Sequence, residues 1–193
     1  MAAAYRVLHV IDHLGMGGAQ EVVGHFLKYG DRRRFQPEVA ALHGYGHYFH
    51  RFRALGVPVF TLAPHTPAAP AVPLIVPRLW RLLRQRRYQV VHTHLLASHL
   101  LATPLAALAG VPLRITHDHT HDAIRSRVPL LGRLDRMVHG LNHRIIAGSG
   151  SIGEYLAREE NLPPPKISVI YCGIELAGLA PADPAFREQA RAA

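Results

Sequence analysis

Imidazole side chains are frequent in this chain, which has 15 histidines among its 193 residues. Five of them stand at or just after the ends of two apolar segments: His92, His94, His117, His119 and His121. Because the carboxyl ends of parallel strands meet at one edge of a sheet, we expect these rings to share a cleft. There they could hydrogen-bond a ligand or stabilise charge, bind zinc, or form an inert histidine-rich surface. The H-D-H-T-H spacing is not specific to zinc, and we predict no metal.

A glycine-rich turn, Gly15-Met16-Gly17-Gly18, is the second feature that could do chemistry. It follows an apolar segment at residues 7–11 and joins it to a helix, where free backbone N–H groups and the helix dipole favour an anion. The dinucleotide fingerprint fails because Gln20 occupies its third glycine position, and the NTPase signature Gly-Lys-Ser/Thr is absent. The turn is therefore either one wall of a ligand site or a tight turn without a ligand. His9 and His13 beside it are expected to pack or cap locally.

Strands and helices that alternate along the chain are expected to position these residues. Apolar segments bounded by turn residues predict strands at 7–11, 38–42, 57–60, 89–93, 113–116, 144–147 and 167–170. Apolar periodicity predicts helices at 18–29, 48–55, 74–87, 95–109, 130–141 and 149–160, the last with Ser149 as its cap. Strands that alternate with helices at this spacing indicate an α/β fold, a Rossmann-like parallel sheet with helices on both faces.

The excess of basic residues limits the kinds of ligand that this protein is expected to bind. Lys and Arg together number 22 against 13 Asp and Glu, a formal charge of +9, which can attract phosphate-bearing ligands, anionic lipid or nucleic acid. No nucleic-acid motif interleaves aromatic residues with these charges, so nucleic acid is not expected. The helix predicted at 74–87 carries Arg78, Arg81, Arg84, Arg86 and Arg87. They form either a solvated face or a surface for an anionic membrane, to which other arginines could add: Arg125, Arg127, Arg133 and Arg136.

Two long uncharged stretches require a test for membrane insertion. Residues 54–77 are too rich in proline for a continuous helix. Residues 90–113 are long enough to span a bilayer, but they contain several polar residues and divide into strand, helix and strand. No signal-peptide pattern opens the chain, and the single cysteine, Cys172, cannot form an internal disulfide. We therefore expect a cytoplasmic protein, at most peripheral at the inner face of the membrane.

Ordered motifs along residues 5–176 resemble one enzyme family. The first strand and the glycine-rich turn resemble the opening of family 4 retaining glycosyltransferases of the GT-B fold. Further matches follow in the same order: R-A-L-G-V-P-V at 53–59, Q-V-V-H-T-H at 89–94, A-G-V-P at 109–112, H-D-H-T at 117–120, R-I-I-A-G-S at 144–149 and K-I-S-V-I-Y-C-G-I-E at 166–175. Two positions depart from the family pattern, since Gln20 replaces a Glu and Cys172 replaces an Asn.

The resemblance implies that residues 1–176 form the N-terminal, acceptor-side half of a GT-B architecture. Residues 177–193 would begin an interdomain linker; the C-terminal domain that mainly holds the nucleotide-sugar donor would be absent, and this chain alone would be inactive. The resemblance further implies His119 as the catalytic residue near the transferred sugar. The implied substrate-binding residues are Gly17, Gly18, Gln20, His94, His117 and Ser149. No cofactor is implied.

The implied function is transfer of a sugar, with retention, from a nucleotide-sugar to a hydroxyl acceptor, either a sugar or a lipid-linked acceptor. Two other classes remain open: a free-standing, non-catalytic module that binds a sugar or phosphorylated ligand, and half of a nucleotide-sugar epimerase of the GT-B fold. No carboxylate stands out as a general base. Asp12 and Asp118 are near the expected cleft, but the sequence offers no partner that would tune their pKa.

Overall fold

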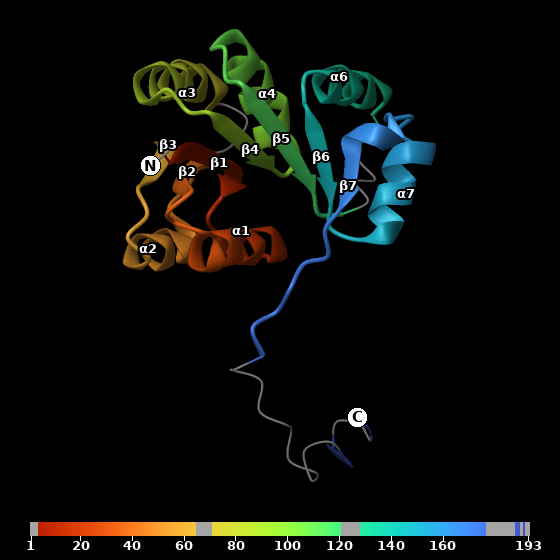
Figure 1. The fold of residues 1–193 in the computed structure, drawn as a ribbon, viewed down its shortest axis with the longest axis horizontal. Helices are drawn as coiled ribbons and strands as arrows, with labels where there is room; N and C mark the ends of the chain where they lie inside the picture. Colours follow the sequence, from red (N-terminus) through yellow and green to blue (C-terminus); the bar gives the residue numbers. More distant parts are fainter. Residues whose placement is uncertain (1–3, 65–70, 121–127, 177–187, 190, 192–193) are drawn as a thin grey trace.

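The computed structural model describes residues 4–64, 71–120, 128–176, 188–189 and 191. Within these residues seven parallel strands form one sheet, in the order β3-β2-β1-β4-β5-β6-β7 (Figure 1). The strands are β1 Tyr5–His13, β2 Phe35–His43, β3 Val59–Ala63, β4 Val90–His94, β5 Leu113–Asp118, β6 Arg144–Ala147 and β7 Ile167–Val169. The predicted Rossmann-like parallel sheet is confirmed.

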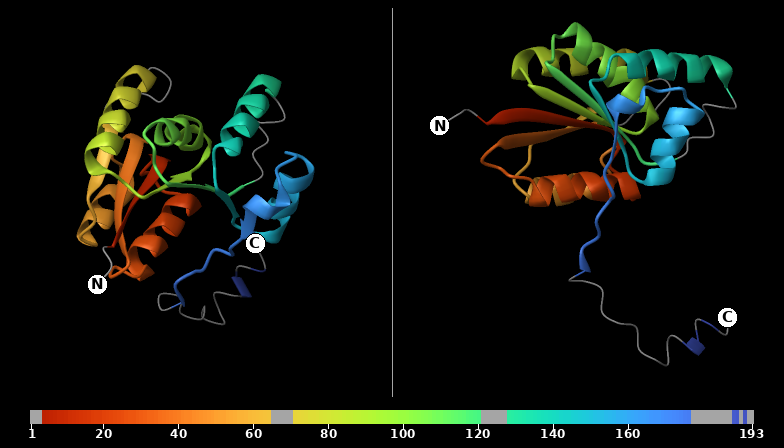
Figure 2. Two further views of the ribbon diagram at one scale, coloured as in Figure 1. Left: turned by 45° about the horizontal axis from the view of Figure 1, so that its top comes forward. Right: turned by 45° about the vertical axis from the view of Figure 1, so that its right-hand side comes forward.

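Helices cover both faces of this sheet, as Figures 1 and 2 show. They are α1 Gly18–Tyr29, α2 Gly46–Ala54, α3 Val72–Arg86, α4 Leu96–Leu108, α6 Pro129–Gly140 and α7 Gly150–Arg158, with a short 3-10 helix, η2, at Pro164–Lys166. The α1 and α2 helices lie together on one face, against β1 and its neighbours. The α3, α4 and α6 helices lie side by side on the other face, and α7 packs on β6 and β7.

The pleat of the strands divides the core into two layers. Leu8 and Val10 of β1 pack with α3 and α4 in one apolar cluster, whereas Ile11 packs with α1 and α2 in another. His9 lies on the α1 side, where its ring stacks on that of Phe26 with centroids 5.8 Å apart. Successive strand side chains point to opposite faces, so this alternation also decides on which side the other strand histidines lie.

The first two strands are longer than the sequence predicted, at Tyr5–His13 and Phe35–His43, and the third strand lies farther along the chain. It was expected at residues 57–60 but runs from Val59 to Ala63. Pro58 has no N–H to donate to a ladder, and only its carbonyl takes part, accepting from the Val39 N–H at 2.9 Å. Regular pairing therefore starts one residue later, at Val39 with Val59.

The uncharged stretch at 90–113 divides as predicted, into β4, α4 and the beginning of β5. Among the described residues, no helix combines the length and apolar character needed to cross a bilayer. The expected linker at 177–193 lies outside the described residues, apart from 188–189 and 191.

Candidate functional site at the carboxyl edge of the sheet

The strand order reverses direction between β1 and β4, which are neighbours in the sheet. The chain leaves β1 toward α1 on one face and leaves β4 toward α4 on the other. At such a switch point the two loops diverge and open a crevice beyond the carboxyl ends of the strands, where ligands of α/β sheets bind. The glycine-rich turn and the end of β4 thus flank the crevice.

The glycine-rich turn is held by side chains of the residues that flank it. His13 Nδ1 accepts the Gly15 N–H at 3.1 Å, and the Gln20 side-chain amide donates to the His13 carbonyl at 3.1 Å. Gln20 is buried, and a Cβ at position 17 would collide with its side-chain oxygen. The lack of a side chain at Gly17 therefore allows the Gln20 side chain to lie close to the turn. The predicted local capping by His13 is confirmed.

The second helix also fixes the turn. The Tyr48 N–H donates to the Leu14 carbonyl at 2.9 Å, and Gly46 packs so closely on the Leu14 carbonyl that a Cβ there would collide with it. Gly46 also has φ +63°, a left-handed conformation that favours glycine. The α1 helix starts at Gly18, and no side chain caps its N-terminus within the described part of the chain. The turn is thus a rigid support that leaves the first N–H groups of α1 at the crevice.

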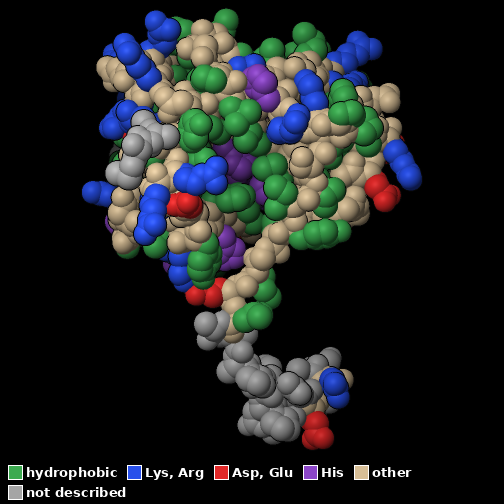
Figure 3. Space-filling view, in the orientation of Figure 1, with side chains coloured by type: hydrophobic (Ala, Val, Ile, Leu, Met, Phe, Trp, Pro, Cys, Tyr) green, Lys and Arg blue, Asp and Glu red, His purple; other side chains and the backbone are tan. Residues whose placement is uncertain are grey.

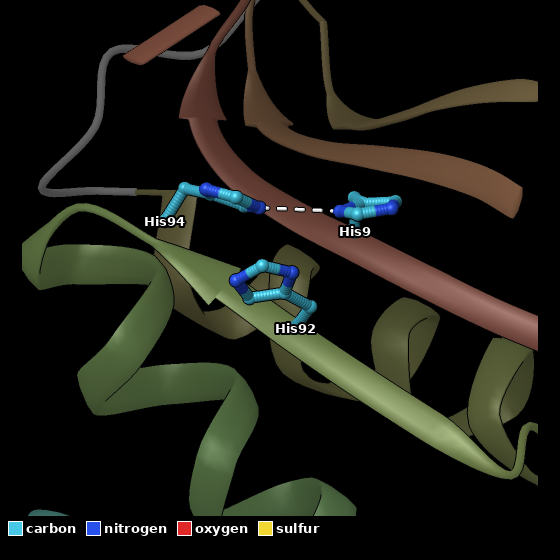
Figure 4. A group of neighbouring side chains, drawn as sticks. All are labelled: His9, His92 and His94. Atoms are coloured by element: carbon cyan, nitrogen blue, oxygen red, sulfur yellow. Dashed lines mark hydrogen bonds between the residues drawn. The ribbon is translucent and has the colours of Figure 1, made fainter. Parts of the chain in front are cut away.

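Histidine rings converge at the ends of β4 and β5. His94 Nδ1 lies 3.3 Å from His119 Nε2, and the rings of His117 and His119 stack with centroids 4.1 Å apart. On its other side, His94 Nε2 lies 3.2 Å from His9 Nδ1, as Figure 4 shows together with His92. We refer to His9, His92, His94, His117 and His119 as the imidazole cluster. The structure therefore brings together His94, His117 and His119, as the sequence predicted for this edge.

Burial keeps the imidazole cluster neutral at pH 7. Desolvation, with the charge of Arg32, lowers the pKa of His9 to about 4. Desolvation and the neighbouring rings lower the pKa of His117 to about 3, and desolvation lowers that of His119 to about 4 against the opposing charge of Asp118. The pKa values of His92 and His94 also lie well below 6.5 for the same reason. A neutral imidazole has one donor and one acceptor, so His94 donates to one neighbour and accepts from the other.

An apolar hollow of about 260 Å³ adjoins the imidazole cluster. His117 lines it together with Phe26 and Tyr29 of α1 and with Tyr171 and Cys172 beyond β7. Both ring nitrogens of His117 are buried without a hydrogen-bond partner among the described residues. Figure 3 shows histidine side chains at the floor of a central hollow surrounded by hydrophobic ones. His117 can therefore hydrogen-bond a polar group that enters this hollow.

Asp12 has a structural partner that the sequence did not reveal. Its carboxylate accepts the Ser98 N–H at 2.6 Å and the Ala97 N–H at 3.3 Å, and so it caps the N-terminus of α4. Burial raises the Asp12 pKa, while these hydrogen bonds oppose the shift. Leu95, which precedes α4, has φ +74° and ψ 164°, a conformation otherwise found almost only in glycine. Asp12 therefore holds a strained strand-to-helix connection.

Ser149 stands next to the imidazole cluster, since a Cβ on the preceding Gly148 would lie 3.7 Å from His117 Nε2. Ser149 follows β6 and caps α7, where its hydroxyl accepts the Ile152 N–H at 3.3 Å. β4 and β5 separate the strand before Ser149 from the strand before the glycine-rich turn. His121 lies outside the described residues, as do Arg125 and Arg127. No contact among the described residues tests a substrate-binding role for Gly17, Gly18, Gln20 or Ser149, so those roles stay predictions.

His9 is the cluster member whose part was missed, because it was expected only to pack or cap locally. His9 pairs with His92 in the register of β1 and β4, so His9, His92 and His94 share one face once these strands are placed side by side. That neighbourhood is a property of the strand order, which the local pattern of β1 does not contain.

Comparisons with known proteins agree with this geometry. The profile of the family described as Glycosyltransferase Family 4 matches residues 16–177. UDP-Gal:alpha-D-GlcNAc-diphosphoundecaprenol alpha-1,3-galactosyltransferase of Escherichia coli is 32% identical over 108 residues, which make up 54% of this chain and 28% of that protein.

Solved structures show the same fold. HepE of Anabaena, in complex with UDP, superposes with a TM-score of 0.74 at 14% identity and covers 97% of this chain and 49% of its own. UDP-N-acetylglucosamine 2-epimerase from Rickettsia bellii superposes with a TM-score of 0.62 at 12% identity over 86% of this chain and 44% of its own. The chain thus spans about half the length of these structural relatives. With the profile match over most of its length, the chain belongs to glycosyltransferase family 4.

Proposed function

We propose that this domain forms the acceptor side of a retaining glycosyltransferase, which moves a sugar from a nucleotide-sugar to a hydroxyl acceptor. One observation carries the proposal: the neutral rings of His94, His117 and His119 converge at the switch point of the sheet. Hydrogen-bond donors and acceptors that are fixed there can bind sugar hydroxyls and stabilise charge that develops during transfer. Family membership supports glycosyl transfer over epimerisation, although both kinds of protein share the fold.

His119 is the proposed catalytic residue. It is the outermost member of the chain of rings, only partly buried, and His94 and His117 hold it from two sides. Its pKa of about 4 makes it neutral at pH 7, so it acts as a hydrogen-bonding group and does not contribute a fixed positive charge. In the transfer, the bond between the anomeric carbon and the diphosphate breaks, the acceptor oxygen bonds to that carbon, and the acceptor proton leaves with the diphosphate.

The donor is proposed to be a nucleotide-sugar carried mainly by a second domain. HepE was solved in complex with UDP, and the E. coli relative is named for a UDP-Gal donor and a diphosphoundecaprenol-linked acceptor. These names favour a UDP-sugar and an acceptor on a lipid diphosphate. On this proposal residues 1–176 form the acceptor-side domain, residues 177–193 begin the linker, and Gly17, Gly18, Gln20 and Ser149 contact substrate when the second domain closes on the crevice.

A lipid-linked acceptor would place this domain at an anionic membrane, and the layer of α3, α4 and α6 has the composition for it. Among the residues of these three helices the only acidic one is Asp135, which is buried. Apolar side chains on α6 point outward, with Leu130 68% and Met137 71% exposed, beside the exposed Arg133. The upper border of Figure 3 shows basic and hydrophobic side chains without an acidic one.

The α3 helix adds to this surface. It presents Leu74 and Trp80 at 42% and 38% exposure, and the Arg84 guanidinium lies over the Trp80 ring at 5.8 Å. Apolar side chains that insert at the headgroup level and arginines that attract anionic lipid are the two components of peripheral membrane binding. We propose that this layer docks the protein at the inner face of a membrane.

The experiment that tests ligand binding uses the chain itself. Histidine ring nitrogens labelled with ¹⁵N are followed by NMR while UDP-galactose or a short-chain lipid diphosphate-sugar is added. The proposal expects the acceptor analogue to shift the His117 and His119 signals and to leave His143, at the opposite edge of the sheet, unchanged. Tight binding of UDP-galactose to this chain alone would favour a free-standing binding module, and no shift with either ligand would remove the assignment of the site.

A further inference from the structure

The strand β3 forms one edge of the sheet. Among the described strands it pairs only with β2. The Pro58 carbonyl faces β2, where it accepts the Val39 N–H at 2.9 Å. Because peptide groups along a strand point alternately to its two sides, the N–H and C=O groups of Val59 and Thr61 point away from β2. An unpaired strand edge of this kind can bind an extended peptide through main-chain hydrogen bonds.

A hollow of about 480 Å³ follows this edge, and we refer to it as the β3 groove. Residues 59–62 of β3 line it, and four residues of a strand span roughly 10 Å. Its two walls belong to the helices on the two faces of the sheet, α3 on one face and α2 on the other (Figure 1). The groove is therefore long enough for a short extended peptide. Its other lining residues are Arg78, Arg81, Leu82, Gln85 and Arg86 of α3, and Tyr45 and Phe49 at the beginning of α2.

The wall formed by α3 is basic. Arg81 is exposed and forms no ion pair with any residue that the structure describes. Arg86 lies 3.4 Å from the Glu38 carboxylate, but Arg6 lies closer to the same carboxylate, at 2.8 Å. One carboxylate is thus shared between two arginines, and the groove keeps a positive charge. The charged side chains that line it are all arginines: Arg78, Arg81 and Arg86.

The wall formed by α2 is aromatic. Tyr45 is 44% exposed, and its ring packs edge-on against Phe49 with centroids 4.9 Å apart. The side chains of an added strand would alternate between the two faces of the sheet. Those directed toward α3 would meet arginines, and those directed toward α2 would meet aromatic rings. The groove therefore favours a segment in which acidic and apolar residues alternate.

Charge also decides which occupant this edge can take. A second copy of this chain would pair through the same edge in a twofold dimer, and the arginines of both copies would then face one another. A compact anion such as phosphate would contact the arginines but leave the strand edge and the aromatic wall without a partner. An extended acidic segment uses the main chain, the arginines and the rings together.

We propose that the β3 groove binds an extended acidic segment of a partner protein, which adds to the sheet beside β3. Its carboxylates lie toward α3 and its apolar side chains toward α2. β2 and β1 separate β3 from β4, so the groove is distinct from the imidazole cluster. Trp80 and Arg84, which belong to the proposed membrane surface, do not line it. The proposal does not rest on the proposed sugar transfer.

Fluorescence anisotropy with synthetic peptides tests the proposal. The probe is a labelled, capped peptide of about eight residues in which Glu alternates with Val and Thr. One matched peptide has Lys for every Glu, and another is N-methylated at every amide, which keeps the charge but removes the main-chain donors. We expect the acidic peptide to bind at least about 10-fold more tightly than either of them.

A charge reversal in the groove should change this preference. Arg81→Glu should weaken binding of the acidic peptide by at least about 10-fold and strengthen binding of the Lys peptide. Arg158→Glu, an exposed change on α7, is the matched control and should bind both peptides like the wild type. Equal binding of the acidic peptide by wild type and Arg81→Glu would overturn the assignment of the groove.

Amide hydrogen exchange shows whether the peptide adds to the strand. We expect the amides of Val59 and Thr61 to exchange more slowly with the acidic peptide bound, and those of β7, at the far edge of the sheet, to be unchanged. The proposal is overturned if the acidic peptide does not bind at about 1 mM, or if the N-methylated peptide binds equally well. It is also overturned if sedimentation velocity shows a dimer whose formation protects the same two amides, because a second copy would then occupy the groove.

Discussion

His94 Nδ1 lies 3.3 Å from His119 Nε2, so a fully buried ring at the end of β4 supports a partly buried ring just beyond the end of β5. His94 is itself held from behind by His9 of β1. A chain of three neutral imidazoles thus runs from the core to the carboxyl edge of the sheet. Its inner members position the outer one, since both ring nitrogens of His94 are engaged along the chain, one with His9 and one with His119.

Replacing His94 tests this positioning role. In an enzyme that joins this domain to a donor-binding domain, His94→Phe keeps the volume of the ring but removes the partner of His119. We expect kcat to fall by about 10-fold with a smaller change in KM, because a misplaced catalytic group weakens transition-state contacts more than ground-state binding. Steady-state kinetics give the two constants. An unchanged kcat would show that His119 does not depend on His94.

Stability should fall as the pH drops below 6.5. The pKa values of His9, His117 and His119 are lowered in the folded state from 6.5 to about 4, 3 and 4, so the unfolded chain takes up protons first. Their contribution to stability is complete above pH 6.5 and is lost progressively toward pH 4. Each such group can add a slope of up to about 1.4 kcal/mol per pH unit.

Denaturant unfolding at pH 7.5, 6.5, 5.5 and 5.0 measures this slope before most carboxylates titrate. We expect the free energy of unfolding to be flat above pH 6.5 and to drop steeply below it. NMR of the ring nitrogens should show that the imidazole cluster does not titrate between pH 7.5 and 5.0 in the folded chain. Equal stability at pH 7.5 and 5.0 would contradict the burial of neutral rings.

Two adjacent glycines should respond differently to alanine. A Cβ at position 17 would displace the side chain of Gln20 from His13, whereas a Cβ at position 18 meets nothing within 4 Å. Gly17→Ala should lower the free energy of unfolding by about 1–2 kcal/mol, the cost of a lost buried hydrogen bond. Gly18→Ala should be neutral or raise it by up to about 1 kcal/mol, because alanine favours the helix.

A double-mutant cycle by denaturant unfolding identifies the cause. In the Gln20→Ala background the collision is gone, so Gly17→Ala should cost much less than it does in the wild type. An equal cost in both backgrounds would mean that the conformation of the turn, and not the contact with Gln20, requires glycine at this position.

The outer face of α6 should govern binding to anionic vesicles. Met137→Ser with Arg133→Glu removes an exposed apolar side chain and reverses an exposed charge. We expect the wild type to sediment with phosphatidylglycerol vesicles but not with phosphatidylcholine, and the double variant to lose at least about 10-fold in affinity. Arg53→Glu, an exposed change on α2 across the sheet, is the control. Equal sedimentation of both variants would remove α6 from the docking surface.

Much of the candidate site could be predicted from the sequence, because the carboxyl ends of parallel strands lie at the same edge of a sheet. The ends of β4 and β5 were recognisable, and their pairing alone brings His94 beside His117. The cap that Asp12 provides to α4 was not predictable in the same way, because it joins residues 86 positions apart through the strand order. The proximity of His99 to Asp135 and His139 was also only partly predictable, since the latter two stand one helical turn apart on α6, but His99 reaches them only when α4 and α6 pack together.

The most direct test of the central claim is sugar transfer by His119→Ala. In an enzyme joining this domain to a donor-binding domain, transfer from a UDP-sugar to a lipid diphosphate acceptor is measured beside His143→Asn, which preserves an acceptor for the Arg114 N–H at the opposite edge. We predict at least about a 100-fold loss of kcat/KM for His119→Ala and wild-type rates for His143→Asn. Wild-type turnover by His119→Ala would contradict the assignment of this edge as the transfer site.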